Sequence, residues 1–159
     1  MTCAIQLSQL LADIVWPALV LEKRMLSLVP IVVGLIVEWL ALWLCGFGLT
    51  WTKAAVVDVV MNTVSSLAGI LLIPALGMGW EYGPGQLLRR IASLGSLSDI
   101  DWLATFAIAL LVTTGVEALV VRWGFRIPLG RRRLAVLLGA NFASVGFAFV
   151  SVILSRPYS

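Results

Sequence analysis

Six polar residues recur in one register inside the apolar segments of this 159-residue chain. In each half a glutamate is followed 24 positions later by an asparagine, and three positions after that by a serine. The two sets lie 79 positions apart and comprise Glu38, Asn62, Ser65, Glu117, Asn141 and Ser144. A carboxyl group inside a bilayer is a functional candidate because its burial is costly. The pattern therefore predicts either a proton or cation site or a pair of structural clasps.

Each interpretation assigns the glutamates a different chemistry. Exclusion of water disfavours the ionised carboxyl group, so Glu38 and Glu117 could hold protons while amide and hydroxyl oxygens act as neutral ligands. In the structural interpretation, a glutamate–asparagine hydrogen bond fixes the register of a helix pair. Such bonds average only about 0.6 kcal/mol in membranes, so they specify geometry more than they stabilise. We favour the clasp because Pro74 falls at the end of an apolar stretch and four helices leave little room for a cavity.

Composition places the chain in a membrane. Hydrophobic residues make up 61% of it, charged residues 12%, and the mean hydropathy is +1.06. A soluble domain carries about a quarter charged residues, so lipid must be the solvent here. Histidine is absent, and Cys3 and Cys45 are isolated. We find no nucleophile, phosphate-loop or metal-ligand motif, and we expect no enzyme activity, cofactor, metal or nucleic-acid partner.

Four apolar stretches have the length of about 20 residues that a helix needs to cross a bilayer. They cover residues 25–47, 54–76, 103–123 and 133–154. We predict an all-α membrane protein with four transmembrane helices as two tandem repeated hairpins, flanked by amphipathic interfacial helices. The predicted segments are an N-terminal interfacial segment, a first hairpin, an extramembrane connector and a second hairpin, at residues 1–24, 25–76, 77–101 and 102–155.

The two interfacial helices are predicted from polar stripes and glycines. Gln6, Gln9 and Asp13 form one polar face, which fits a helix lying on the membrane or a fifth span with its stripe turned inward. In the connector we expect a glycine-rich turn at 77–85, followed by a short surface helix from Leu87.

Basic residues predict the orientation. The turn before the last span contains Arg126, Arg131 and Arg132, with Arg133 at the helix start, and we interpret these as headgroup and topology anchors. This places both hairpin turns in the cytoplasm and both termini outside, in a bacterial inner membrane. Asp58, about one turn inside the second span, is interpreted as a solvated or headgroup-paired end residue.

The chain has almost no extramembrane mass with which to act. We therefore expect a non-enzymatic accessory subunit that packs in the lipid bilayer against other membrane protein subunits, or against itself as a homo-oligomer. The second hypothesis is a small proton- or cation-coupled transporter or channel that uses the glutamates within the membrane.

Overall fold

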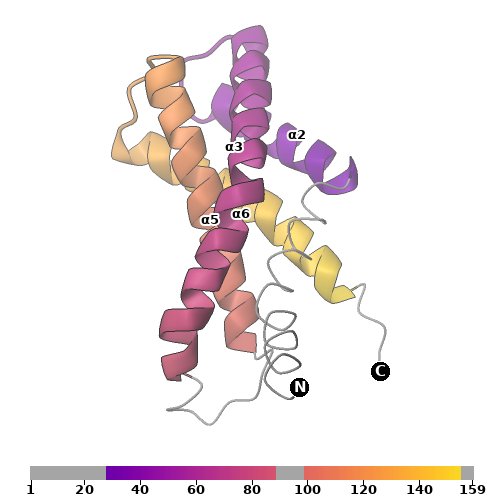
Figure 1. The fold of residues 1–159 in the computed structure, drawn as a ribbon. Helices are drawn as coiled ribbons and strands as arrows, with labels where there is room; N and C mark the ends of the chain where they lie inside the picture. Colours follow the sequence, from indigo (N-terminus) through magenta and orange to yellow (C-terminus); the bar gives the residue numbers. More distant parts are fainter. Residues whose placement is uncertain (1–27, 89–98, 155–159) are drawn as a thin grey trace, which may run out of the picture.

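The computed structural model describes residues 28–88 and 99–154. In chain order the elements are α2 (Leu28–Leu44), α3 (Trp51–Trp80), η1 (Glu81–Gly85), α5 (Asp99–Leu119), η2 (Val120–Gly124) and α6 (Arg131–Leu154) (Figure 1). The π-helical segments η1 and η2 continue α3 and α5. No strand occurs in these two ranges, which confirms the predicted all-helical class for them.

Three helical segments are long and apolar enough to cross a membrane, Trp51–Leu88, Ile100–Gly124 and Arg131–Ser151. They indicate that the protein is integrated into a membrane. The fourth, α2, has 17 residues and is shorter than a typical span of about 20. Residues 25–27 of the predicted first span lie outside the described part of the chain. A fourth spanning helix therefore stays a prediction.

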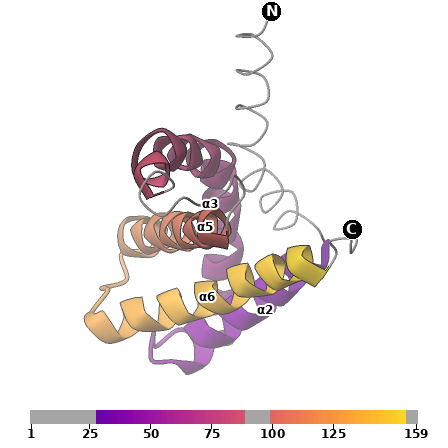
Figure 2. The same ribbon diagram turned by 90° about the horizontal axis from the view of Figure 1, so that it is seen from below.

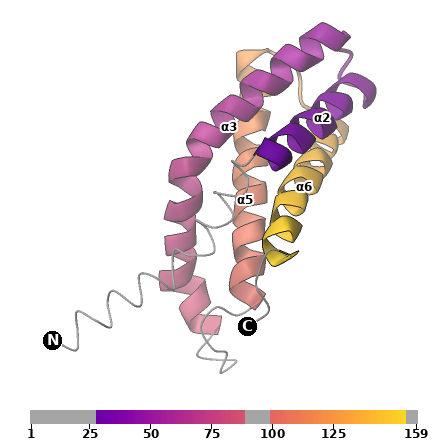
Figure 3. The same ribbon diagram turned by 90° about the vertical axis from the view of Figure 1, so that its right-hand side faces the viewer.

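The helices form two side-by-side pairs that cross one another. α2 packs along α6, and α3 packs along α5, as Figures 2 and 3 both show. Consecutive helices also make contact, α2 with α3 and α5 with α6. Each helix thus contacts its neighbour in the chain and one helix from the other half. Since lipid supplies no hydrophobic force between helices, this arrangement must rely on close packing and polar contacts.

Two apolar clusters occupy the interior on either side of a polar layer. The cluster nearer the helix turns contains Leu42, Phe47, Ala54, Val57, Met61, Val121, Ile127 and Leu137. The second cluster contains Ile73, Trp102, Ala109, Val112, Val145 and Ala148. Along α3, α5 and α6, the polar residues of the repeated pattern fall between members of the two clusters.

Both short turns lie at the upper end of the molecule in Figure 1. The first turn uses Gly46 and Gly48 at φ values of +87° and +70°, a region open mainly to glycine. Thr50 then caps α3, because its side chain accepts a hydrogen bond from the backbone N–H of Lys53 at 3.4 Å. The second turn, which Pro128 and Gly130 predict, separates η2 from α6.

The glycine-rich turn predicted at 77–85 is wrong, because the chain stays helical there through Leu88. A backbone group in lipid must find its hydrogen bond within the helix, and local π geometry can accommodate a proline such as Pro84. Gly85 lies in a tight place, since a Cβ there would lie 3.0 Å from the backbone oxygen of Trp80. The Trp80 indole N–H donates to Asp101 Oδ1 at 3.2 Å and connects this helix end to α5.

Other boundaries differ from the prediction by a few residues. α5 begins at Asp99 instead of 103, and α6 begins at Arg131 instead of 133. Pro74 lies inside α3 instead of at its end. The predictions for residues 4–21 and for most of the surface helix after Leu88 fall outside the described residues.

Candidate functional site

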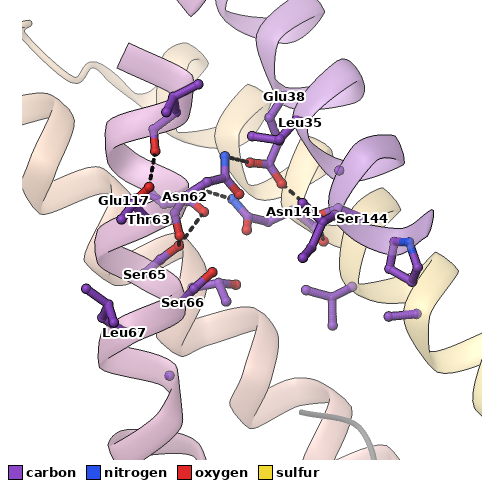
Figure 4. A pocket seen from close by; sticks show the side chains of 18 of the residues that line it. Leu35, Glu38, Asn62, Thr63, Ser65, Ser66, Leu67, Glu117, Asn141 and Ser144 are labelled. Atoms are coloured by element: carbon purple, nitrogen blue, oxygen red, sulfur yellow. Dashed lines mark hydrogen bonds between the residues drawn. The ribbon is translucent and has the colours of Figure 1, made fainter. Parts of the chain in front are cut away.

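The six repeated polar residues meet where the two helix pairs cross (Figure 4). Within the first half, the Asn62 amide donates to Glu38 Oε2 at 2.6 Å. Within the second half, the Asn141 amide donates to Glu117 Oε2. Both predicted glutamate–asparagine hydrogen bonds are therefore present, and each joins consecutive helices of the chain.

The serines connect the two halves, which the sequence did not predict. Ser144 on α6 donates to Glu38 Oε1 at 2.7 Å, and Ser65 on α3 donates to Glu117 Oε1 at 3.1 Å. Each glutamate therefore accepts one hydrogen bond from the asparagine of its own half and one from the serine of the other. All four carboxyl oxygens have a donor, and the four helices are joined through two side chains.

The two glutamates of this polar layer are buried and have no basic partner among residues 28–88 and 99–154. Glu38 is 2% exposed and Glu117 is 1% exposed. In the described ranges every lysine and arginine is exposed except Arg133, which is half-buried at the turns. Removing an ionised carboxylate from water costs several kcal/mol, on the order of the energy that a close cation would return. These carboxyl groups can therefore take up a proton or bind a cation that comes from outside the layer.

Asp58 belongs to the same layer, so its interpretation as a solvated end residue is wrong. It is 2% exposed, and its Oδ1 accepts a hydrogen bond from the Asn62 amide at 3.1 Å. α3 begins at Trp51, which places Asp58 about two helical turns inside the helix. Asp58, Asn62 and Ser65 follow the i, i+4, i+7 spacing of one helix face, a signal that would have predicted their common site.

A cavity of about 400 Å³ opens between α2 and α3 onto this layer. Its floor contains Glu38, Glu117 and the two asparagines, and its walls are mostly apolar. The expectation that four helices leave little room for a cavity is therefore wrong. Small side chains explain the space, since Ser66 and Gly69 line it from α3. Gly34 also lines it, and a Cβ there would lie 3.3 Å from Ser144 Cβ, so glycine lets α2 approach α6.

The corresponding region between α5 and α6 is filled by aromatic rings. Phe106 on α5 lies 5.4 Å from Phe142 and 5.3 Å from Phe149, measured between ring centroids. Trp102 extends this group, with its ring 6.2 Å from Phe149. In the first half, the residues that correspond to Phe142 and Phe149 are Thr63 and Ile70, 79 positions earlier on α3. Thr63 and Ile70 are smaller than phenylalanine, and both line the cavity.

The predicted headgroup anchors do not behave alike. Arg126, Arg131 and Arg132 are exposed near the second turn, where a headgroup role stays a prediction. Arg133 instead connects the two turns. Its Nε donates to Gly46 O at 3.1 Å, and its Nη1 donates to Pro128 O at 2.8 Å. Its guanidinium carbon also lies 5.7 Å from the centre of the Phe47 ring.

No group of three or more histidine, cysteine, aspartate or glutamate side chains suited to a metal ion exists within 28–88 and 99–154. Glu38 and Asp58 accept hydrogen bonds from the same Asn62 amide, and Glu117 accepts from Asn141 and Ser65. Comparison of the chain with protein-family models, curated proteins and solved structures gives no match.

Proposed function

We propose that this protein is a small proton-coupled membrane carrier, whose cavity carboxyl groups hold protons and a cationic solute in turn. The observation that carries the proposal is the meeting of Glu38, Asp58 and Glu117 in a buried layer with no basic side chain from the described residues. Three such acids cannot all be ionised at the site without a counter-charge. A mobile proton and a mobile cation are the two sources of that charge.

The cavity raises this hypothesis above the structural one favoured by the sequence. A clasp needs buried donors and acceptors, and the layer has them. A clasp does not need about 400 Å³ of open space beside the carboxyl groups of Glu38 and Glu117. Ligand pockets range from about 300 to 1,000 Å³, so the space suits a small solute. Carriers of this kind move their solute by binding and release, so the proposal includes no covalent chemistry.

The accessory-subunit role is the second candidate. It is favoured by a shallow apolar groove of about 480 Å³ between the end of α3 and α5. Leu76, Trp80 and Leu111 line this groove and could receive an apolar side chain from another subunit or from a second copy. A monodisperse monomer in mild detergent, with no protein that co-purifies, would count against this role.

We propose tandem duplication as the origin of the site. It is supported by the hydrogen bonds, which match when α2 is superposed on α5 and α3 on α6. The packing matches in the same way, because the contact of α2 with α6 corresponds to that of α5 with α3. A pseudo-two-fold axis along the membrane normal then relates two hairpins inserted the same way up, which requires α2 to span the bilayer. We further propose a bacterial inner membrane as the location, with both turns on the cytoplasmic side.

Proton flux in reconstituted vesicles tests the function. Full-length protein is incorporated into liposomes that contain a pH-sensitive dye, and a pH gradient is imposed with tetraethylammonium as the exchanging cation on the opposite side and the membrane potential clamped. The matched variant is Glu38→Gln with Glu117→Gln, which keeps hydrogen-bonding capacity and removes titration. We expect the variant to dissipate the gradient more slowly by about a hundredfold, the lower range for a positioned proton-transfer group.

Folding of the variant is checked by helical circular dichroism and gel filtration in the same detergent. Wild-type vesicles no faster than protein-free vesicles would overturn the proposal. So would a folded double variant that conducts protons at the wild-type rate.

A further inference from the structure

The walls of the cavity define what kind of cation fits it. Around the carboxyl floor the lining is apolar, with Leu35 on α2, Ile73 on α3 and Val145 on α6 among its members. A bare metal ion would leave this apolar surface without a partner, and the described acids offer no metal-type cluster. The complementary ligand has one positive charge and an apolar body.

The mouth of the cavity indicates where that ligand comes from. Ile31 on α2 and Leu67 and Ile70 on α3 line the opening and are exposed at 39%, 63% and 43%. α3 is part of a segment apolar and long enough to span a membrane, so its exposed apolar side chains contact acyl chains. A ligand that enters between α2 and α3 therefore passes from the hydrocarbon of the bilayer, which only a lipophilic cation populates.

The neutral polar groups also suit such a ligand. Glu38 and Glu117 use their oxygens to accept hydrogen bonds from Asn62, Asn141 and the two serines. A quaternary or delocalised cation needs no hydrogen bond, so it can approach these carboxyl groups without displacing their donors. The site thus favours diffuse charge over a compact, strongly hydrated cation.

We propose that the cavity between α2 and α3 binds a lipophilic organic cation, with its charge against Glu38 and Glu117 and its apolar body along α2, α3 and α6. The inference rests on the proposed function only in treating these two carboxyl groups as exchangeable. Binding converts a protonated carboxyl group to a carboxylate beside the cation, and the proton leaves to water. Net charge in the cavity is unchanged by this exchange.

Binding of tetraphenylphosphonium to the full chain in detergent tests this assignment. The control ligand is tetraphenylborate, which has similar size and shape and the opposite charge. We expect the cation to bind at least about tenfold more tightly than the anion, since a unit charge near a carboxylate is worth several kcal/mol at intermediate dielectric. Equal affinity for the two ions would overturn the proposal.

Two variants locate the binding site. Glu38→Gln with Glu117→Gln removes the charge, and Thr63→Phe introduces the ring that α6 has at position 142 into the mouth of the cavity. Each should weaken tetraphenylphosphonium binding by about tenfold or more. The matched control is Leu71→Phe, which adds a ring on the same helix at a position 73% exposed and outside the cavity. It should bind as the wild type does.

Retained binding in both folded variants would overturn the assignment. The two proposals fail separately. Proton flux that depends on the glutamates, without preference for the phosphonium ion, would support the carrier proposal and overturn this ligand class. Charge-selective binding without proton flux would support the ligand site and overturn the carrier proposal.

Discussion

The two halves of the molecule use the same polar residues and differ in what surrounds them. An open cavity lies between α2 and α3, whereas Phe106, Phe142 and Phe149 pack against one another between α5 and α6. On the open side α3 has Thr63, Ser66 and Gly69, where α6 has Phe142, Val145 and Ala148. The comparison shows that the volume of neighbouring side chains decides whether a cavity reaches a buried polar layer. The repeated polar residues are the same in both halves.

The second difference is one of charge. Asp58 lies one turn before Asn62, and the residue one turn before Asn141 is Leu137. Both are 2% exposed. The first half therefore has a buried acid that the second half lacks, hydrogen-bonded to the Asn62 amide that lines the cavity.

The largest effect should come from giving the closed half the acid of the open half. Leu137→Asp places a carboxyl group in the apolar cluster near the turns, where no cavity or basic side chain of the described part serves it. We expect destabilisation of about 3 kcal/mol or more. Unfolding in sodium dodecyl sulfate, followed by circular dichroism, measures it. A variant as stable as the wild type would show that the closed half tolerates charge equally.

The next largest effect should come from removing one ring of the aromatic group between α5 and α6. Phe106→Ala deletes the ring that contacts both Phe142 and Phe149. We expect a loss of about 2 kcal/mol, below the usual cost for a fully buried phenylalanine, because Phe106 is only half-buried. Thr63→Ala on the open side should change stability by less than about 0.5 kcal/mol, as exposed substitutions do. Equal costs, measured by the same unfolding assay, would remove the contrast in packing.

The two asparagines give a smaller and sharper comparison. Both asparagines line the cavity, but Asn141 is 2% exposed and Asn62 is half-buried. Asn141→Ala should cost about 1.5 kcal/mol, near the upper limit for membrane hydrogen bonds, and Asn62→Ala about 0.5 kcal/mol, near their average, because its amide is less buried. If Asn62→Ala proves the costlier variant in the unfolding assay, the view that the second half is the more tightly packed one is contradicted.

The last comparison replaces Asp58 by the residue of the other half. Asp58→Leu removes a buried acid that has no basic partner among the described residues, so we expect stabilisation of about 1 kcal/mol. The cost should appear in function, as slower proton flux in vesicles. A variant that is destabilised by more than about 1 kcal/mol would instead assign Asp58 a structural role through its contact with Asn62.

Sequence spacing predicted which residues share a depth in the membrane. It predicted the glutamate–asparagine pairs because antiparallel neighbours place Glu38 and Asn62 at one level. It did not predict the hydrogen bonds from the two serines to the glutamates of the other half. The depth of a residue in the membrane does not say which helix of the other half packs against its own helix. That choice depends on how the two pairs cross, which depends on small contacts such as Gly34 against Ser144.

The cavity and Asp58 were missed for related reasons. A cavity arises from the summed volumes of side chains on several helices, and a linear pattern does not contain that sum. Asp58 was placed near the membrane surface because the start of its helix was placed three residues too late, at Ala54 instead of Trp51. The turn predicted at 77–85 had a similar cause, since glycine and proline counts outweighed the requirement for continuous backbone hydrogen bonding.

Arg133 fastens the two turns together through Gly46 and Pro128. The two hairpins are thereby joined at one end, and any separation between them must widen with distance from that point. Movement at the far end can leave both of these hydrogen bonds in place. Arg133 would then be the pivot of such a movement, because it holds the near ends of the hairpins together.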